Sequence, residues 1–165
     1  MSPRQPVEMP PPKTTMTTRA GITGSFITRA PEETFALAEE IGRELSQPAI
    51  FLLIGDLGTG KTVFAKGLAA GLGIDPDDVT SPSFTFISQH RGRLRFYHID
   101  LYRLEDARAL SDHLGIEEIL AEPAVVVIEW GDKLGRVVGP NVYTVELTWI
   151  DETTRDIKIR QQEVI

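Results

Sequence analysis

Two segments of the chain are apolar at every position, without the alternation that marks a half-exposed strand. They are residues 49–54 (AIFLLI) and residues 124–128 (AVVVI). Continuous runs of this length are typical of strands that are buried on both faces of a sheet. The pattern therefore predicts two central strands that form the parallel core of an α/β fold.

Two longer segments carry apolar residues at helical spacing. The first is predicted over residues 31–45, where a proline opens the helix and Glu32 and Glu33 occupy the first turn. The helix dipole favours acidic residues at that end. The second helix is predicted after residue 62, where apolar residues recur at helical spacing from Val63, and it is predicted to stop near Gly71 and Gly73. Shorter helical segments are predicted around residues 105–112 and 116–120, on either side of Gly115.

Shorter stretches of apolar and β-prone residues predict the remaining strands. Residues 25–28 predict a short strand, and residues 84–89 and 94–99 predict a hairpin with its turn at Arg91-Gly92-Arg93. The tail alternates well enough to predict an antiparallel pair, residues 141–150 and 154–163, that turns at residues 151–152.

The composition places limits on the function. The chain has 165 residues, enough for one domain, and a formal net charge of −7. An acidic surface argues against tight, unaided binding to nucleic acid. The chain has no cysteine, which excludes disulfides, thiolate catalysis and cysteine-ligated metals, and its three histidines lack the spacing of a zinc site.

The first residues differ from the rest in composition. Five prolines lie within residues 1–12, and a threonine-rich run follows. We predict a disordered leader over residues 1–22 and a folded domain over residues 23–165. The leader has no apolar core for a signal peptide, and no segment approaches the roughly 20 apolar residues of a membrane span. We therefore expect a cytoplasmic protein that does not associate with membranes.

The segment between the first apolar run and the second helix carries the clearest chemical signal. Residues 55–62 read GDLGTGKT and fit the P-loop (Walker A) pattern G-x-x-x-x-G-K-[ST] at every fixed position. In such a loop, backbone N–H groups point at phosphate oxygens, the lysine binds the β- and γ-phosphates, and the hydroxyl binds Mg²⁺. We therefore expect a nucleoside triphosphate to be bound by Gly58, Thr59, Gly60, Lys61, Thr62 and Val63.

With this motif the predicted fold class is complete. The chain is expected to be α/β, a single P-loop NTPase domain with a mixed, mostly parallel central sheet flanked by helices and a C-terminal antiparallel strand pair.

Two carboxylates stand at the ends of predicted strands. Glu129 follows residues 124–128, and Asp100 follows residues 94–99. A P-loop site needs a carboxylate on a neighbouring strand to hold Mg²⁺ and a group that positions the attacking water. We predict that Asp100 and Glu129 are the catalytic residues, although the residues alone leave open which acid does which task. Residues 80–85 (TSPSFT) are hydroxyl-rich and could respond to a γ-phosphate, but such clusters are also common in turns.

Several motifs together resemble one family. The loop GDLGTGKT is followed by TSPSFT, by HIDLYRL at residues 98–104 and by Ile128-Glu129-Trp130. These elements, in this order and spacing, are similar to the bacterial tRNA threonylcarbamoyladenosine biosynthesis ATPases, the TsaE or YjeE family. The resemblance covers about residues 25–150. Ser83 departs from the threonine that is usual in the family, while keeping a hydroxyl group.

The resemblance implies an ATPase that works with the TsaB and TsaD proteins. Together they place a threonylcarbamoyl group on N6 of adenosine 37 in ANN-decoding tRNAs, so tRNA is contacted indirectly through the complex. ATP and Mg²⁺ are the implied cofactors. By match, Lys61 would bind phosphates, Thr62 with Glu129 would hold Mg²⁺, Asp100 would be tied to hydrolysis, and Trp130 would lie beside the nucleotide.

Other interpretations remain open from the sequence. A small-molecule kinase, or a nucleotide-gated interaction module with little hydrolysis, would use the same loop. If one strand ran through Arg91, Arg93 and Arg95, these arginines would share a face, either to protect an edge strand or to contact a partner or tRNA. His98 shares the predicted strand face of Asp100; we favour a packing role for it over a general base.

Overall fold

A computed structural model of the chain describes residues 22–80, 82, 85–107 and 114–162. The predicted leader, except for residue 22, lies outside the described residues, so the division at residue 22 stays a prediction. The same holds for three positions of the hydroxyl-rich segment, 81, 83 and 84, and for residues 108–112 of the helical segment predicted over 105–112.

The described residues form one seven-stranded sheet in the order β1-β7-β6-β2-β5-β4-β3. The pairs β6–β2, β2–β5 and β5–β4 are parallel, whereas β1–β7, β7–β6 and β4–β3 are antiparallel. Only β3 and β7 therefore run against the other five strands, which confirms the mixed, mostly parallel sheet. The strands are β1 (Gly24–Thr28), β2 (Ala49–Ile54), β3 (Ile87–Arg91), β4 (Arg95–Asp100), β5 (Ala124–Glu129), β6 (Val142–Trp149) and β7 (Arg155–Gln161).

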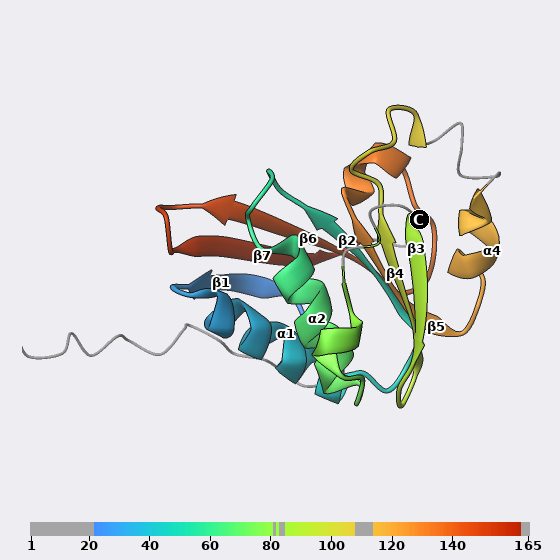
Figure 1. Ribbon diagram of the computed structural model, residues 1–165, viewed down its shortest axis with the longest axis horizontal. Coiled ribbons are helices and arrows are strands. Elements are labelled where there is room, and N and C mark those ends of the chain that lie inside the picture. The colour runs from blue at the N-terminus through green and yellow to red at the C-terminus, as the bar shows by residue number, and fades with distance from the viewer. Residues whose placement is uncertain (1–21, 81, 83–84, 108–113, 163–165) are drawn as a thin grey trace, which may run out of the picture.

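Helices cover both faces of this sheet. Helices α1 (Pro31–Glu44) and α2 (Lys61–Gly71) lie side by side on one face, and the short α4 (Ile116–Leu120) lies on the opposite side (Figure 1). Two 3₁₀ turns, η1 (Pro76–Asp78) and η2 (Gly131–Leu134), complete the described helical elements. Helix α2 ends at Gly71, and Gly73 has a φ of 84°, a left-handed conformation that glycine adopts without strain. The predicted stop is thus confirmed.

Strand β2 shows why a continuous apolar run was needed. Phe51 and Leu53 belong to the hydrophobic core under α1 and α2, whereas Ile50 and Leu52 belong to a second core with Ile116 of α4. Side chains alternate between the faces of a strand, so a strand covered on both sides needs apolar residues throughout. The predicted burial on both faces is confirmed.

The three arginines of the β3–β4 hairpin do not share a strand face. Arg91 ends β3 and lies opposite Arg95 at the start of β4, so Arg93 falls in the turn between them. The condition for a shared face is therefore not met, because the antiparallel register closes before it reaches residue 93. The predicted turn at residues 91–93 begins one residue later, since Arg91 still pairs within β3. Arg95 instead pairs with Glu122, with 3.0 Å between Nη1 and Oε2.

Arg93 binds the carboxyl ends of two helices. Its guanidinium donates hydrogen bonds to the carbonyl oxygens of Leu45 at 2.5 Å and Gly42 at 2.8 Å, at the end of α1. Its backbone N–H donates to the carbonyl oxygen of Leu72, just after α2, at 2.7 Å. The last carbonyls of a helix have no partner within the helix, and a cation is favourable there. Arg93 therefore joins α1, α2 and the hairpin.

Among the described residues, no helix has the length and the apolar run that a membrane span requires.

Candidate functional site

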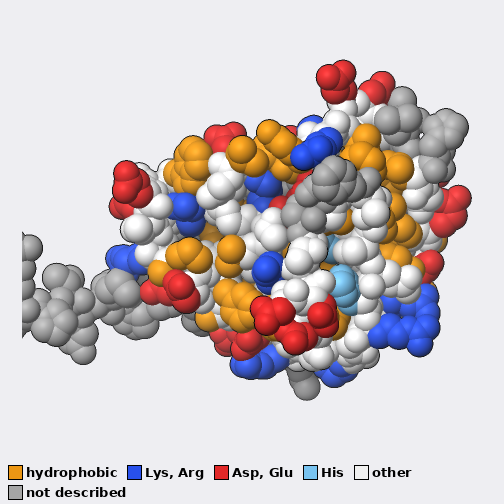
Figure 2. Space-filling model, in the orientation of Figure 1, with side chains coloured by type: hydrophobic (Ala, Val, Ile, Leu, Met, Phe, Trp, Pro, Cys, Tyr) orange, Lys and Arg blue, Asp and Glu red, His pale blue; other side chains and the backbone are white. Residues whose placement is uncertain are grey.

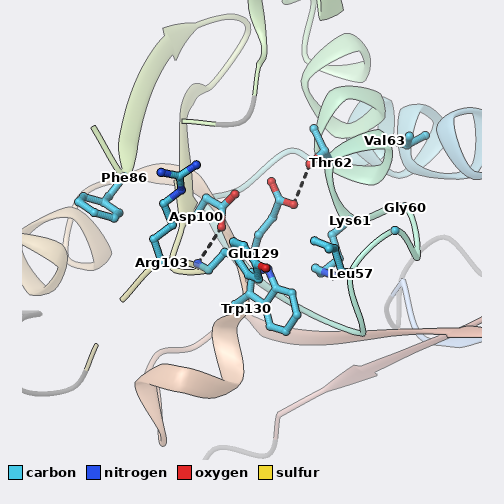
Figure 3. A pocket seen from close by; sticks show the side chains of 12 residues that line it. Leu57, Gly60, Lys61, Thr62, Val63, Phe86, Asp100, Arg103, Glu129 and Trp130 are labelled. Atoms are coloured by element: carbon cyan, nitrogen blue, oxygen red, sulfur yellow. Dashed lines mark hydrogen bonds between the residues drawn. The ribbon is translucent and has the colours of Figure 1, made fainter. Parts of the chain in front are cut away.

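A pocket of about 470 Å³ opens where β2, β4 and β5 end. Parallel strands present their carboxyl ends at one edge of the sheet, where open α/β folds place their ligands. The pocket contains every residue predicted for the site except Thr59, which is buried inside the loop. It is lined by Leu57, Gly58, Gly60, Lys61, Thr62, Val63, Phe86, Asp100, Tyr102, Arg103, Glu129 and Trp130, most of which are labelled in Figure 3.

The loop between β2 and α2 has the conformation that its glycines permit. Gly58 and Gly60 have φ values of 81° and 102°, in the left-handed region where a side chain would be strained. The Thr59 hydroxyl donates to the carbonyl oxygen of Asp56 at 2.9 Å and closes the turn from inside. Gly60 then caps α2, which begins at Lys61, so the helix amino end faces the pocket.

The Lys61 ammonium group lies inside this loop. Its Nζ donates to the carbonyl oxygens of Gly55 and Asp56, both at 2.7 Å. Burial lowers the pKa of Lys61, although the nearby carboxylates of Glu129 and Asp100 act in the opposite direction. A cation that has lost part of its hydration gains strongly from an anionic ligand, so this position favours phosphate oxygens.

Thr62, Glu129 and His98 form a chain of hydrogen bonds across the sheet. The Thr62 hydroxyl donates to Glu129 Oε1 at 2.8 Å, the bond drawn in Figure 3. The other oxygen, Oε2, lies 2.5 Å from His98 Nε2. His98 is fully buried and Glu129 is 3% exposed. The carboxylate is therefore fixed at both oxygens, with one of them directed at the first turn of α2.

His98 takes the packing role that the sequence favoured. Its bond to Glu129 joins neighbouring strands, since His98 lies on β4 and Glu129 ends β5. A carboxylate oxygen only accepts, so Nε2 carries the proton. The other ring nitrogen, Nδ1, is buried and has no hydrogen-bond partner among the described residues.

Asp100 meets Glu129 because their strands end together. The two residues lie opposite each other in the parallel register of β4 and β5. Asp100 Oδ1 accepts a hydrogen bond from the Tyr102 N–H at 2.9 Å, which turns the chain at the end of β4. Figure 3 shows the Asp100 side chain beside Glu129, whose carboxylate lies between Asp100 and Thr62. Carboxylate and hydroxyl oxygens are the ligands that Mg²⁺ prefers, so the residues present fit that cation.

Trp130 forms one wall of the pocket in a strained backbone conformation. Its φ is 60°, which costs an ordinary residue about 1 kcal/mol or more. The ring centroid lies 4.2 Å from Lys61 Nζ, a cation–π distance, and 5.2 Å from the ring of Tyr102. Lys133 Nζ stabilises the neighbouring segment, because it donates hydrogen bonds to the carbonyl oxygens of Leu101, Tyr102 and Leu104.

Two further residues contact the phosphate loop, and the motifs did not indicate either. Trp149 Nε1 donates to the carbonyl oxygen of Gly58 at 3.4 Å, and Arg155 Nε donates to that of Thr59 at 3.3 Å. They belong to the β6–β7 hairpin, which extends past the end of β2 because Ile54 pairs with Glu146 while β6 continues to Trp149. The predicted length of the tail strands indicated a long hairpin. The sequence did not indicate the register of β6 against β2, which brings the hairpin to the loop.

Comparison with known proteins identifies the family. The sequence model of the family "Threonylcarbamoyl adenosine biosynthesis protein TsaE" matches residues 28–158. A protein of Treponema pallidum named tRNA threonylcarbamoyladenosine biosynthesis protein TsaE is 35% identical over 133 residues, which cover 81% of this chain and 97% of that protein. The protein of the same name in Bacillus subtilis is 44% identical over 101 residues, 61% of each chain.

A solved structure leads to the same family. The crystal structure of Bacillus subtilis YdiB matches with a TM-score of 0.67 and 31% identity, and the match covers 83% of this chain and 84% of that one. The resemblance indicated by the motifs is thus confirmed: this chain belongs to the TsaE family.

Proposed function

We propose that this chain is a Mg²⁺-dependent ATPase subunit required for threonylcarbamoylation of adenosine 37 in tRNAs that read ANN codons. It acts by ATP-driven turnover of a complex with TsaB and TsaD. The observation that carries the proposal is the convergence of Lys61, Thr62, Asp100 and Glu129 on one pocket at the end of the parallel strands. Membership of the TsaE family supplies the pathway.

Phosphate binding is assigned to the loop and to Lys61. The amide groups at the start of α2 face the pocket, and the helix dipole favours an anion there. Lys61 would exchange the carbonyl oxygens of Gly55 and Asp56 for β- and γ-phosphate oxygens. Carbonyl and phosphate oxygens both accept hydrogen bonds, so the ammonium group keeps its hydrogen bonds in the exchange. The phosphate adds a negative charge beside it.

Thr62 and Glu129 are the residues that would hold Mg²⁺. When bound, the ion neutralises charge on the β- and γ-phosphate oxygens. Glu129 is oriented for this task by His98, whose bond to Oε2 leaves Oε1 directed at Thr62. The orientation is built into the sheet, because both residues come from buried strands.

Asp100 is assigned to the attacking water. It lies next to Glu129 across the β4–β5 pairing and faces the same pocket, where a carboxylate can accept a proton or orient a water molecule. Glu129 is bound by Thr62 and His98 and is assigned to Mg²⁺, so the attacking water is assigned to Asp100. This division of the two carboxylates is the part of the mechanism that the sequence left open.

The charge distribution favours action through protein partners. The net charge is −7. On the face seen in Figure 2, the described Lys and Arg side chains form small separate groups and no continuous basic patch. Affinity for RNA depends largely on neutralised phosphates. We therefore assign tRNA contact to the partners.

The test is ATP hydrolysis by the purified protein, alone and with TsaB and TsaD, together with threonylcarbamoylation of an ANN-decoding tRNA. We expect slow turnover alone that rises in the complex, and loss of both activities in Lys61→Ala. Lys66→Ala is the matched control, since Lys66 lies on the same helix but outside the pocket. Turnover that partners leave unchanged would count against the proposal, and phosphate transfer to a small acceptor would indicate a kinase.

A further inference from the structure

Arg155, the first residue of β7, binds two separate groups of backbone carbonyls. On one side its guanidinium donates to the phosphate loop, from Nη2 to the carbonyl oxygen of Gly58 at 3.4 Å and from Nε to that of Thr59 at 3.3 Å. On the other side Nη1 donates to carbonyl oxygens of the β6–β7 turn, with distances of 3.0 Å to Asp151 and 3.2 Å to Glu152. One side chain therefore fastens the phosphate loop to the hairpin beside it.

The two peptide units that Arg155 binds belong to the phosphate-binding motif. The Gly58 unit carries the Thr59 N–H, which donates to the Asp56 carbonyl oxygen at 3.3 Å, and the Thr59 unit carries the Gly60 N–H. In a trans peptide the C=O and the following N–H point in opposite directions, and the described residues contain no cis peptide. When the Thr59 carbonyl points to Arg155, the Gly60 N–H points away from it, and Gly60 lines the pocket. Holding the outer side of the loop thus sets the direction of its inner donors.

The loop needs such a support because glycine gives it little stiffness of its own. Gly58 and Gly60 flank Thr59, both in left-handed conformations, and glycine can leave that region readily. Trp149 adds a second contact on the same side, from Nε1 to the Gly58 carbonyl. Trp149 is 50% exposed, so Arg155, with a charged and planar group of donors, is the stronger of the two supports.

We propose that Arg155 is a positioning residue for phosphate binding. It fixes the peptide planes on both sides of Thr59, so that the Gly60 amide is aligned before a phosphate arrives, and its charge polarises that amide. Pre-alignment strengthens binding because less ordering remains to be done when the ligand enters. This inference rests on the proposed binding of ATP, and it concerns the di- and triphosphate part of the ligand rather than the base.

The test compares Arg155→Gln and Arg155→Lys with Arg160→Gln, an exposed arginine on the same strand. Binding of ATP and of inorganic pyrophosphate is measured by calorimetry, and the Thr59 and Gly60 amides are followed by NMR. We expect Arg155→Gln to weaken both ligands about tenfold, as loss of one charge-assisted contact would. Arg155→Lys should lose less, because an ammonium group keeps the charge but not the planar fork, and Arg160→Gln should bind as the unmodified protein does.

Each outcome decides the inference. Unchanged affinities in Arg155→Gln would overturn it, and so would weaker binding with unchanged Thr59 and Gly60 amide signals, since the residue would then act only on the hairpin. If Arg155→Gln does not fold, the test rests on Arg155→Lys. The inference is overturned if this variant binds both ligands as tightly as the unmodified protein does. Failure of the unmodified protein to bind either ATP or pyrophosphate would instead overturn the proposed function.

Discussion

One arginine binds backbone carbonyls at the edge where the parallel strands begin, and another does so at the edge where they end. The two arginines have different roles. At the amino end of β4, Arg93 donates to the last carbonyls of α1, whose peptides have no further task. At the edge where the parallel strands end, Arg155 donates to the carbonyl oxygens of Gly58 and Thr59. The Thr59 peptide carries on its other side the Gly60 N–H, which we assign to phosphate binding. The same chemistry therefore stabilises the fold at one end and shapes the site at the other.

Strain and buried charge follow the same division. The described residues other than glycine that have positive φ are Phe86 and Trp130, and both lie beside the pocket. The buried charged side chains Lys61 and Glu129 are there too. Such features cost stability and persist where function requires them. Changes at the carboxyl end should therefore alter the chemistry, and changes at the amino end should alter the stability.

The largest effect is expected for Asp100→Asn. Asparagine keeps an oxygen that can accept from the Tyr102 N–H, so the end of β4 is preserved while the negative charge is lost. We expect hydrolysis to fall about 100-fold, with ATP affinity changed by less than about threefold. Single-turnover hydrolysis and equilibrium binding measure the two quantities separately.

Asp132→Asn is the matched control for that change, since Asp132 is an exposed acid on η2 that does not line the pocket. A parallel loss of ATP binding in Asp100→Asn would make Asp100 a metal holder or a structural residue, and would remove the assigned role in hydrolysis.

Arg93→Ala should have the opposite profile. It leaves the final carbonyls of α1 without their donor, and we expect the free energy of unfolding to fall by about 2 kcal/mol and the Tm by about 5 °C. ATP affinity should stay the same, because Arg93 is at the far end of the sheet. Denaturant unfolding and calorimetric binding test both parts.

Arg91→Ala, in the same hairpin, is the control and should change neither stability nor ATP affinity. A loss of ATP affinity in Arg93→Ala would contradict the division between the two ends of the sheet.

A pair of substitutions at Trp130 measures the strain directly. Both Trp130→Gly and Trp130→Ala remove the ring, but only alanine keeps the cost of the left-handed backbone, where φ is 60°. We expect the glycine variant to be more stable by about 1 kcal/mol in urea unfolding. At Glu40, an exposed position inside α1, the alanine variant should instead be more stable than the glycine variant by a similar amount. Equal stability of the two Trp130 variants would mean that the backbone at residue 130 is not strained.

The smallest effect concerns Glu122, near the amino end of β5. Hydrogen bonds from the Tyr97 hydroxyl and the Arg95 guanidinium lower the pKa of Glu122 below its usual value of 4.5. A lowered folded-state pKa contributes stability above the usual value, and this contribution is lost as the pH falls through the folded-state pKa. Glu122→Gln should therefore be slightly less stable at pH 7 and should equal the unmodified protein in acid. Urea unfolding at both pH values measures the gap, and a gap that does not close in acid would contradict this assignment.

Local patterns predicted the parts of the molecule that local chemistry decides. The apolar runs at residues 49–54 and 124–128 became β2 and β5, and the phosphate loop lies between β2 and α2 as the motif requires. The predicted meeting of Asp100 and Glu129 at one pocket also follows from local patterns, because the ends of adjacent parallel strands meet.

Contacts that depend on register between distant segments were not predictable. Arg155 contacts a loop residue 96 positions earlier, and this requires both the β2–β6 and β6–β7 pairings to be known. Arg93 was expected in the hairpin turn, but its contacts with helix ends 48 or more residues away were not predictable. The positive φ of Trp130 has no sequence signal, since tryptophan has no preference for that conformation.

The place of β7 in the sheet has a consequence for protein synthesis. The strand pairs with β1 on one side and β6 on the other, so two of the last strands to be made lie between β1 and β2, which are among the first. A ribosome that has released only the first two helices has therefore exposed a phosphate loop without its support and a sheet with a gap. We therefore expect a nascent chain to lack the Arg155 contacts with the loop until β7 has emerged.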